Sequence, residues 1–211
     1  MSGLLSYISN LAMVTIDRTG YAGVFVLSAL ESAAIPIPSE VVVPFSGFLA
    51  VSGRFSFWTV VFVTTAANLV GSLIIFFIAK NGGRWILEHY GKYFLIHHDD
   101  LENGDKWFKR YGTKAVFWGR ILPGIRTFIS LGAGIAEMDL HKFVIYTFLG
   151  ALPWNFALTL VGYKAGKNWA VLHEYFRRID IFIVLLVGVG VAWYVWRHIR
   201  SNLKFKNQNA K

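Results

Sequence analysis

The sequence predicts an all-α integral membrane protein built on an inverted repeat. Of its 211 residues, 55% are hydrophobic and only 16% are charged, a balance typical of integral membrane proteins. Long uncharged stretches alternate with short charged runs that contain proline. Each repeat is expected to hold a re-entrant hairpin and one transmembrane helix. Interfacial amphipathic helices and a C-terminal transmembrane helix complete the predicted fold.

Three stretches have the composition of membrane-spanning helices. Residues 55–79 carry no charge over 25 positions, which is enough for a tilted span. Residues 143–163 form a second span, which we expect to kink at Pro153. Residues 181–196 form a third, shorter run, so the arginines at its ends are expected to reach outward to the headgroups.

Two further apolar stretches, 20–50 and 115–136, are interrupted by proline and by charge. The first contains the run IPIPSE at 35–40, and the second contains GRILPGIR at 119–126. Broken backbone at membrane depth is tolerated only where it packs on protein or lines a wet cavity. We therefore interpret both stretches as re-entrant hairpins. The residues expected to break their helices are Pro36, Pro38 and Pro123.

An internal repeat supports this organisation. The pattern K-x-G-x-x-W begins at Lys80 and again at Lys164, and a similar offset aligns Phe57 with Phe143. One crossing per repeat places the second repeat in the opposite orientation. The predicted single membrane domain divides into repeat 1 (about 20–85), an amphipathic connector (86–113), repeat 2 (about 114–169), a C-terminal transmembrane helix (179–197) and a basic tail (198–211).

The connector and the tail indicate the orientation in the membrane. Asp99 and Glu102 resemble an N-cap pair that opens a short amphipathic helix lying on the membrane surface. The basic tail places the C-terminus in the cytoplasm, because positively charged segments stay on that side. Counting crossings puts the connector on the same side. The predicted location is the inner (cytoplasmic) membrane.

Two acids and two arginines lie within the predicted hairpins, and these residues are the candidate binding site. They are Glu31, Glu40, Arg120 and Arg126. Ionised side chains inside a membrane are costly, so their default interpretation is functional. Arginine favours an anionic guest, because its guanidinium group binds phosphate oxygens in a forked geometry and stays charged. The structural alternative is a set of ion pairs that lock the hairpins together.

Other polar residues are candidates for a substrate path. Lys80 and Lys164 lie near the two membrane surfaces, where they are expected to attract a headgroup. Asn68 and Asn155 lie near the middle of their helices, where the alternative role of a side-chain amide is to form a hydrogen bond between helices. We predict no metal site, no cofactor and no nucleic-acid partner, because neither a metal-ligand cluster nor a recognisable binding module is present. We attribute the net charge of +9 to lysines and arginines that are held at an anionic membrane surface.

The run from Glu31 to P-S-E, together with FWGRILPGIRTF at 117–128, resembles the DedA family, whose members are also described as SNARE-associated or VTT-domain membrane proteins. The resemblance covers roughly residues 20–170. It implies two facing re-entrant hairpins, membrane lipid translocation and functional roles for the four charged residues. Bacterial members are linked to undecaprenyl phosphate recycling with proton-coupled behaviour, and eukaryotic relatives to phospholipid scrambling. Where some members have Asp in P-G-D, this chain has Glu40 in P-S-E.

Together these features predict a non-enzymatic, proton-coupled transporter for a phosphorylated lipid, either undecaprenyl phosphate or a phospholipid. Its expected partners are membrane lipids, the phosphate-bearing substrate and protons. A homo-oligomer is an additional possibility. The alternatives are a proton-coupled ion or small-anion transporter, a passive scramblase, an intramembrane lipid phosphatase and a structural membrane organiser. The phosphatase is disfavoured, because no histidine nucleophile with a partnering base lies near the two arginines.

Overall fold

The structure is a computed structural model, which describes the backbone of residues 2–35, 37, 39–83, 98–122, 126 and 128–166. All of these residues belong to one compact unit of the chain, Met1–Leu172. The three predicted hairpin-breaking prolines lie outside the described residues. The predicted C-terminal span and the basic tail also lie outside them.

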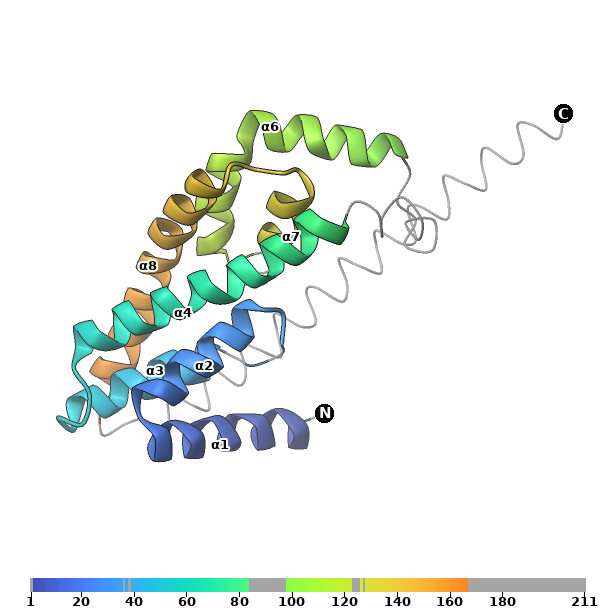
Figure 1. The fold of residues 1–211 in the computed structure, drawn as a ribbon. Helices are drawn as coiled ribbons and strands as arrows, with labels where there is room; N and C mark the ends of the chain where they lie inside the picture. Colours follow the sequence, from blue (N-terminus) through green and yellow to red (C-terminus); the bar gives the residue numbers. More distant parts are fainter. Residues whose placement is uncertain are drawn as a thin grey trace, which may run out of the picture. The chain divides into compact units, whose positions relative to one another are not determined.

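Every regular element among the described residues is a helix (Figure 1). In chain order they are α1 (Ser2–Thr19), α2 (Tyr21–Ser32), α3 (Ser39–Val51), α4 (Phe57–Ile78), a π-helical segment (Ala79–Gly83), α6 (His98–Ile121), α7 (Phe128–Ile135) and α8 (Leu140–Ala165). Two helices among the described residues are long and apolar enough to cross a membrane, Phe57–Gly83 and Leu140–Ala165. They correspond to the first two predicted spans.

The ends of α8 are fixed by local chemistry. The side chain of Asp139 accepts a hydrogen bond of 3.0 Å from the backbone N–H of Lys142, which caps the first turn. This hydrogen bond holds the pKa of Asp139 below its ordinary value. At the other end, Gly166 has φ of 45°, a left-handed conformation that glycine adopts without strain. Between these caps the helix continues through Pro153.

The two long helices run antiparallel, as three side-chain contacts along their length show. The ring of Phe57, at the start of α4, lies 5.6 Å from that of Tyr163, near the end of α8. In the middle, Asn155 donates a hydrogen bond of 3.2 Å to Thr65. Farther along, the rings of Phe76 and Phe143 stack at 4.5 Å. The C-terminal ends of α4 and α8 therefore lie at opposite ends of the pair (Figure 1).

The two long helices bury polar side chains and expose apolar ones. Buried polar residues line their inner faces: Thr64, Thr65, Asn68 and Ser72 on α4, and Thr147, Asn155 and Thr159 on α8. Large apolar residues face outward: Trp58, Phe62, Val70, Ile74, Phe77 and Ile78 on α4, and Ile145, Leu149 and Val161 on α8. Apolar residues such as Val60, Phe76 and Phe143 are buried with these polar ones, so both faces of the helices are largely apolar. Polar contacts inside and apolar side chains outside are typical of helices that pack within lipid.

The shorter helices pack on this pair in a reciprocal pattern. Helix α2 packs on α4 as α6 packs on α8, and α3 packs on α8 as α7 packs on α4. Glycines permit the closest approaches. A side chain at Gly71 would collide with the backbone of α2, and one at Gly150 would collide with the backbone of α6. Each long helix thus packs mainly on one helix of the pair α2–α3 and on one helix of the pair α6–α7.

Both ends of the segment that contains α2 and α3 lie at the start of α4. Tyr21 opens α2, and its ring stacks at 4.4 Å on that of Phe55, which follows α3. The Tyr21 hydroxyl also accepts a hydrogen bond of 2.7 Å from the backbone N–H of Ser56. Beside them, Arg54 forms an exposed ion pair with Asp17 of α1. The chain therefore leaves this end of the molecule through α2 and returns to it through α3.

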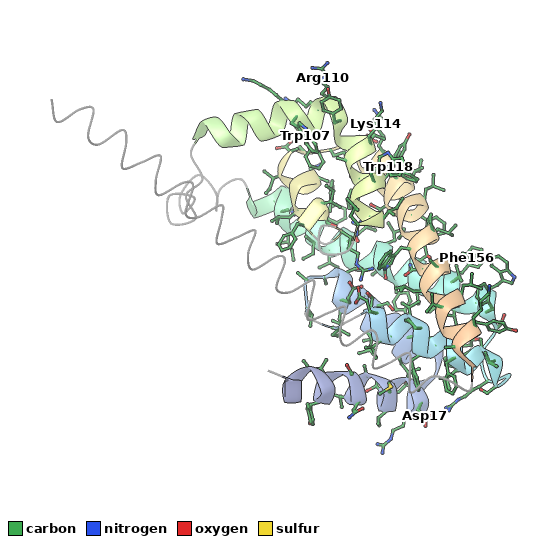
Figure 2. The ribbon with its side chains drawn as sticks, turned by 180° about the vertical axis from the view of Figure 1, so that it is seen from behind. Asp17, Trp107, Arg110, Lys114, Trp118 and Phe156 are labelled. Carbon is green, nitrogen blue, oxygen red and sulfur yellow. The ribbon has the colours of Figure 1, made fainter. Side chains whose placement is uncertain are left out.

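Helix α6 differs from the short connector helix that the sequence predicts. It is continuous from His98 to Ile121, so it runs through the predicted boundary between residues 113 and 114, and Asp99 lies within it. It changes direction near its middle (Figure 1). Trp107 and Arg110 lie on its first arm and Trp118 on its second, and all three side chains are exposed (Figure 2). One helix thus contains part of the predicted connector and the start of the second predicted hairpin.

Candidate functional site

The two predicted hairpins contact each other where their chains reverse. One nitrogen of Arg126, Nη2, donates hydrogen bonds to Oε1 of Glu31 and to the hydroxyl of Ser39. All three residues are buried, with exposed fractions of 7%, 8% and 3%. These contacts join positions that lie 95 and 87 residues apart in the sequence. The sequence analysis places these two charges in separate hairpins, and the structure brings them into a direct ion pair.

Local structure positions these groups. Glu31 lies in the last turn of α2, and Ser39 is the first residue of α3. Between them, Ala34 has φ of 67°, so the chain turns sharply before α3 begins. Arg126 lies between α6 and α7. The ion pair therefore forms between the last turn of α2 and the segment that connects α6 to α7.

The second arginine, Arg120, lies beside this ion pair and is 3% exposed. It belongs to the last turn of α6, where the helix dipole favours a positive charge. Its Nη2 donates a hydrogen bond of 2.5 Å to the hydroxyl of Ser130 on α7. Arg120 is close enough to Arg126 for the two positive charges to repel, and it also attracts Glu31. The aliphatic stem of Arg120 packs beside Gly150 of α8.

Each guanidinium group also lies over an aromatic ring of α8. The central carbon of Arg126 is 5.7 Å from the ring centre of Trp154, and that of Arg120 is 5.9 Å from the ring centre of Phe143. Such cation–π contacts are most favourable where water is excluded. The rings leave the N–H groups of both arginines free to form the hydrogen bonds with Glu31, Ser39 and Ser130.

Glu40 joins the cluster indirectly. It lies in the first turn of α3, where the helix dipole favours a negative charge. Its Oε2 accepts a hydrogen bond of 3.1 Å from the hydroxyl of Ser39, which in turn accepts one from Arg126. Glu40 is half-buried and also repels Glu31. The two acids that the sequence treats alike thus have different positions, one bonded to Arg126 and the other linked to it through a serine.

Several buried polar atoms of the cluster have no hydrogen-bond partner among the described residues. They are Nη1 of Arg126, Nε of Arg120, Oε2 of Glu31 and Nε1 of Trp154. Buried polar groups are normally satisfied, because leaving one unpaired costs about 1–3 kcal/mol. Three of these four atoms are N–H donors, and they belong to the two arginines and to the tryptophan beside Arg126. This arrangement suits an anionic group with several acceptor oxygens.

The predicted path residues lie outside this cluster. Lys80 is exposed in the π-helical segment after α4, and Lys164 is exposed in the last turn of α8. Asn155 is fully buried and bonds to Thr65, so it links the two long helices. Asn68 is also buried, and its Oδ1 has no partner among the described residues. No group of three or more metal-ligating side chains occurs in the part of the chain that the structure describes.

The sequence analysis missed four side chains that contact the arginines: Ser39, Ser130, Phe143 and Trp154. Ser39 stands in the IPIPSE run, but serine is common in apolar helices as a hydrogen-bond donor to the backbone, so neither serine is recognisable as the partner of an arginine. The aromatic residues lie in a predicted span, where rings usually face lipid or the interface. Only their contacts with distant residues reveal them.

Two helices long and apolar enough to cross a membrane, with ionisable groups buried in the helices and turns packed beside them, are the features of a helical membrane protein. The family model described as the VTT domain matches residues 37–164. That match covers more than half of the chain, so the protein belongs to the VTT-domain (DedA) family of membrane proteins.

The chain is 38% identical over 170 residues to the uncharacterized membrane protein YkoX of Bacillus subtilis, covering 79% of this chain and 75% of the relative. It is 30% identical over 199 residues to undecaprenyl phosphate transporter A of Staphylococcus aureus, covering 90% and 96%. The protein of that name from Bacillus subtilis is 30% identical over 194 residues, covering 92% of both chains. No solved structure matches the chain.

Proposed function

We propose that this protein moves a phosphate-bearing lipid across the cytoplasmic membrane and that the charged cluster binds the phosphate. One observation carries the proposal: two buried arginines adjoin, and among the described residues only one carboxylate, that of Glu31, accepts a hydrogen bond from either of them, namely from Arg126. The cluster also has unpaired N–H donors on both arginines and on Trp154. Two relatives that align over nine tenths or more of this chain are named undecaprenyl phosphate transporter A, which makes that polyprenyl phosphate the first substrate to test.

The fold supports an inverted repeat with two re-entrant hairpins. Antiparallel long helices would cross the membrane in opposite directions, and the reciprocal packing of the short helices relates the two halves. The hairpin that contains α2 and α3 returns to the end from which it starts. With these ends at one surface, its tip would meet that of the second hairpin within the membrane. The predicted repeat boundaries and the cytoplasmic C-terminus belong to this proposal.

Phosphate binding follows from the chemistry of the cluster. A lipid phosphate offers several acceptor oxygens and one or two negative charges, which match the forked donors of Arg126 and Arg120. The first residues of α3 and α7 lie near the two arginines, because Ser39 and Ser130 are their bonding partners. Helix N-termini favour anions through their free N–H groups and the helix dipole. Arginines and helix ends together would replace the water that surrounds a phosphate in solution.

Proton coupling follows from charge balance. A phosphate bound to Arg120 and Arg126 would displace Glu31 or Glu40 from its contacts with these guanidinium groups. A carboxylate that loses its partner while buried takes up a proton rather than remain charged. Lipid binding would then be linked to proton uptake, and lipid release to proton loss. The protein would act as a transporter without changing covalent bonds in its substrate.

The test uses purified protein in proteoliposomes that contain fluorescent undecaprenyl phosphate. We expect the protein to translocate this lipid and to leave the matched alcohol, undecaprenol, in its original leaflet. Equal movement of both lipids would contradict phosphate recognition and favour a passive scramblase. Flux of small anions without lipid movement would favour the ion transporter. Lipid transport that is indifferent to pH and to an uncoupler would remove proton coupling from the proposal.

A further inference from the structure

The hydroxyl group of Ser39 connects the phosphate-binding arginine to the half-buried acid. It accepts a hydrogen bond from Nη2 of Arg126 and donates one of 3.1 Å to Oε2 of Glu40. A serine hydroxyl has one proton to donate and two lone pairs that accept. Ser39 is 3% exposed, so bulk water competes little for the hydrogen bonds of its hydroxyl group. Its single proton can therefore be directed to only one acceptor at a time.

The second arginine provides a contrast. Ser130 accepts a hydrogen bond of 2.5 Å from Arg120 and is fully buried. No hydrogen bond joins Ser130 to a carboxylate among the described residues, whereas Ser39 lies next to Glu40 in the chain and bonds to it. Each arginine thus has a serine partner, and only the partner of Arg126 reaches an acid.

The charged groups that act on Glu40 come from the neighbouring elements. Glu31 of α2 repels it, and Arg126 reaches it through Ser39. Helix α4 has no ionisable side chain, and α8 faces the cluster with the ring of Trp154. The charged residue of α1 that pairs near α3 is Asp17, which binds Arg54 beyond the other end of α3. The other charged residues of α8, which also packs on α3, are His141 and Lys142 in its first turn and Lys164 in its last turn.

We propose that Ser39 is the positioning residue that links phosphate binding at Arg126 to protonation of Glu40; this inference rests on the proposed function. With the site free and Glu40 ionised, the Ser39 proton points to the carboxylate. When phosphate binds to Arg126, Glu40 takes a proton from water and becomes a donor to Ser39. The serine hydroxyl then turns its own proton to a phosphate oxygen. One proton is gained for each lipid bound, and no covalent bond of the lipid changes.

The test compares Ser39→Ala with Ser130→Ala in the undecaprenyl phosphate proteoliposome assay over a series of pH values. Removing either serine is expected to lower the maximal rate, because each bonds to an arginine. Only Ser39→Ala is expected to move the alkaline limb of the profile, by about one pH unit to higher pH, which is the effect of one hydrogen bond to a charged group. Ser39→Thr keeps the hydroxyl and should restore the original midpoint.

A third serine supplies a control for folding. Ser46 of α3 is fully buried and bonds only to the backbone of its own helix, at 2.8 Å from the Val42 carbonyl. Ser46→Ala should leave the pH profile unchanged. A Ser39→Ala profile with the original midpoint would overturn the link while leaving lipid transport intact. An unmodified protein whose transport has no pH dependence would instead overturn proton coupling itself, and the link with it.

Discussion

Replacing Arg126 with methionine should destabilise the protein far more than replacing both members of its ion pair. The side chains of Arg126 and Glu31 are each 9% exposed, so removing one leaves the other charge buried and unpaired. Removing one partner lowers the free energy of unfolding by about 3–5 kcal/mol, whereas exchanging both partners for apolar residues of similar size changes it little. At about 2–4 °C per kcal/mol, Arg126→Met should lower Tm by roughly 6–20 °C. The double variant Glu31→Leu with Arg126→Met should recover most of that loss.

The assay is thermal unfolding in detergent, followed by tryptophan fluorescence, together with lipid transport. The exposed Asp17–Arg54 pair is the control: its side chains are 57% and 44% exposed, so Arg54→Met should cost no more than about 1 kcal/mol. We expect the double variant to be stable and inactive. A double variant as unstable as the single one would refute the buried pair. A stable double variant with full transport would show that the pair has only a structural role.

Three further predictions follow from the packing and the topology. Gly150→Ala should lower both Tm and transport, because the new Cβ would lie within 3 Å of two atoms of α6, whereas Gly82→Ala meets no atom within 4 Å and should change neither. In this cysteine-free chain, Leu122→Cys near the second hairpin tip should react with a water-soluble thiol reagent, and Phe62→Cys on the outer face of α4 should not; equal labelling would contradict the re-entrant hairpin. The pKa of the Asp139 carboxyl group is lowered in the folded protein. This cap should therefore stabilise α8 fully at a pH above the ordinary pKa of a carboxyl group, and the stabilisation should be lost as the pH falls through the lowered pKa. Asp139→Ala should therefore lower Tm at neutral pH only, and a difference that persists in acid would contradict this reason.

The long helices and the charged residues of the site could be predicted from the sequence, because both depend on composition. An uncharged stretch such as 55–79 has few alternatives to a buried or membrane-spanning helix. Charges within apolar sequence are similarly conspicuous, and the structure brings Glu31, Arg120 and Arg126 together. Their roles in transport stay a prediction.

The partners of those charges could not be predicted, since they depend on contacts between distant segments. Ser39 stands in the IPIPSE run and Ser46 does not, but the sequence does not show that Ser39 bonds to Arg126 and Ser46 to its own helix. The continuity of α6 could not be predicted either, because its polar first half and more apolar second half suggest two separate elements. A helix that passes from a surface into a protein interior changes composition without ending.

The most direct test of phosphate binding by the hairpin tips is the rate of undecaprenyl phosphate translocation by Arg126→Lys. Lysine keeps the positive charge, but its ammonium group cannot reproduce the forked geometry of a guanidinium group. We expect this variant to lose transport while Arg54→Lys, at the exposed ion pair, keeps the full rate. Full transport by Arg126→Lys would contradict the account.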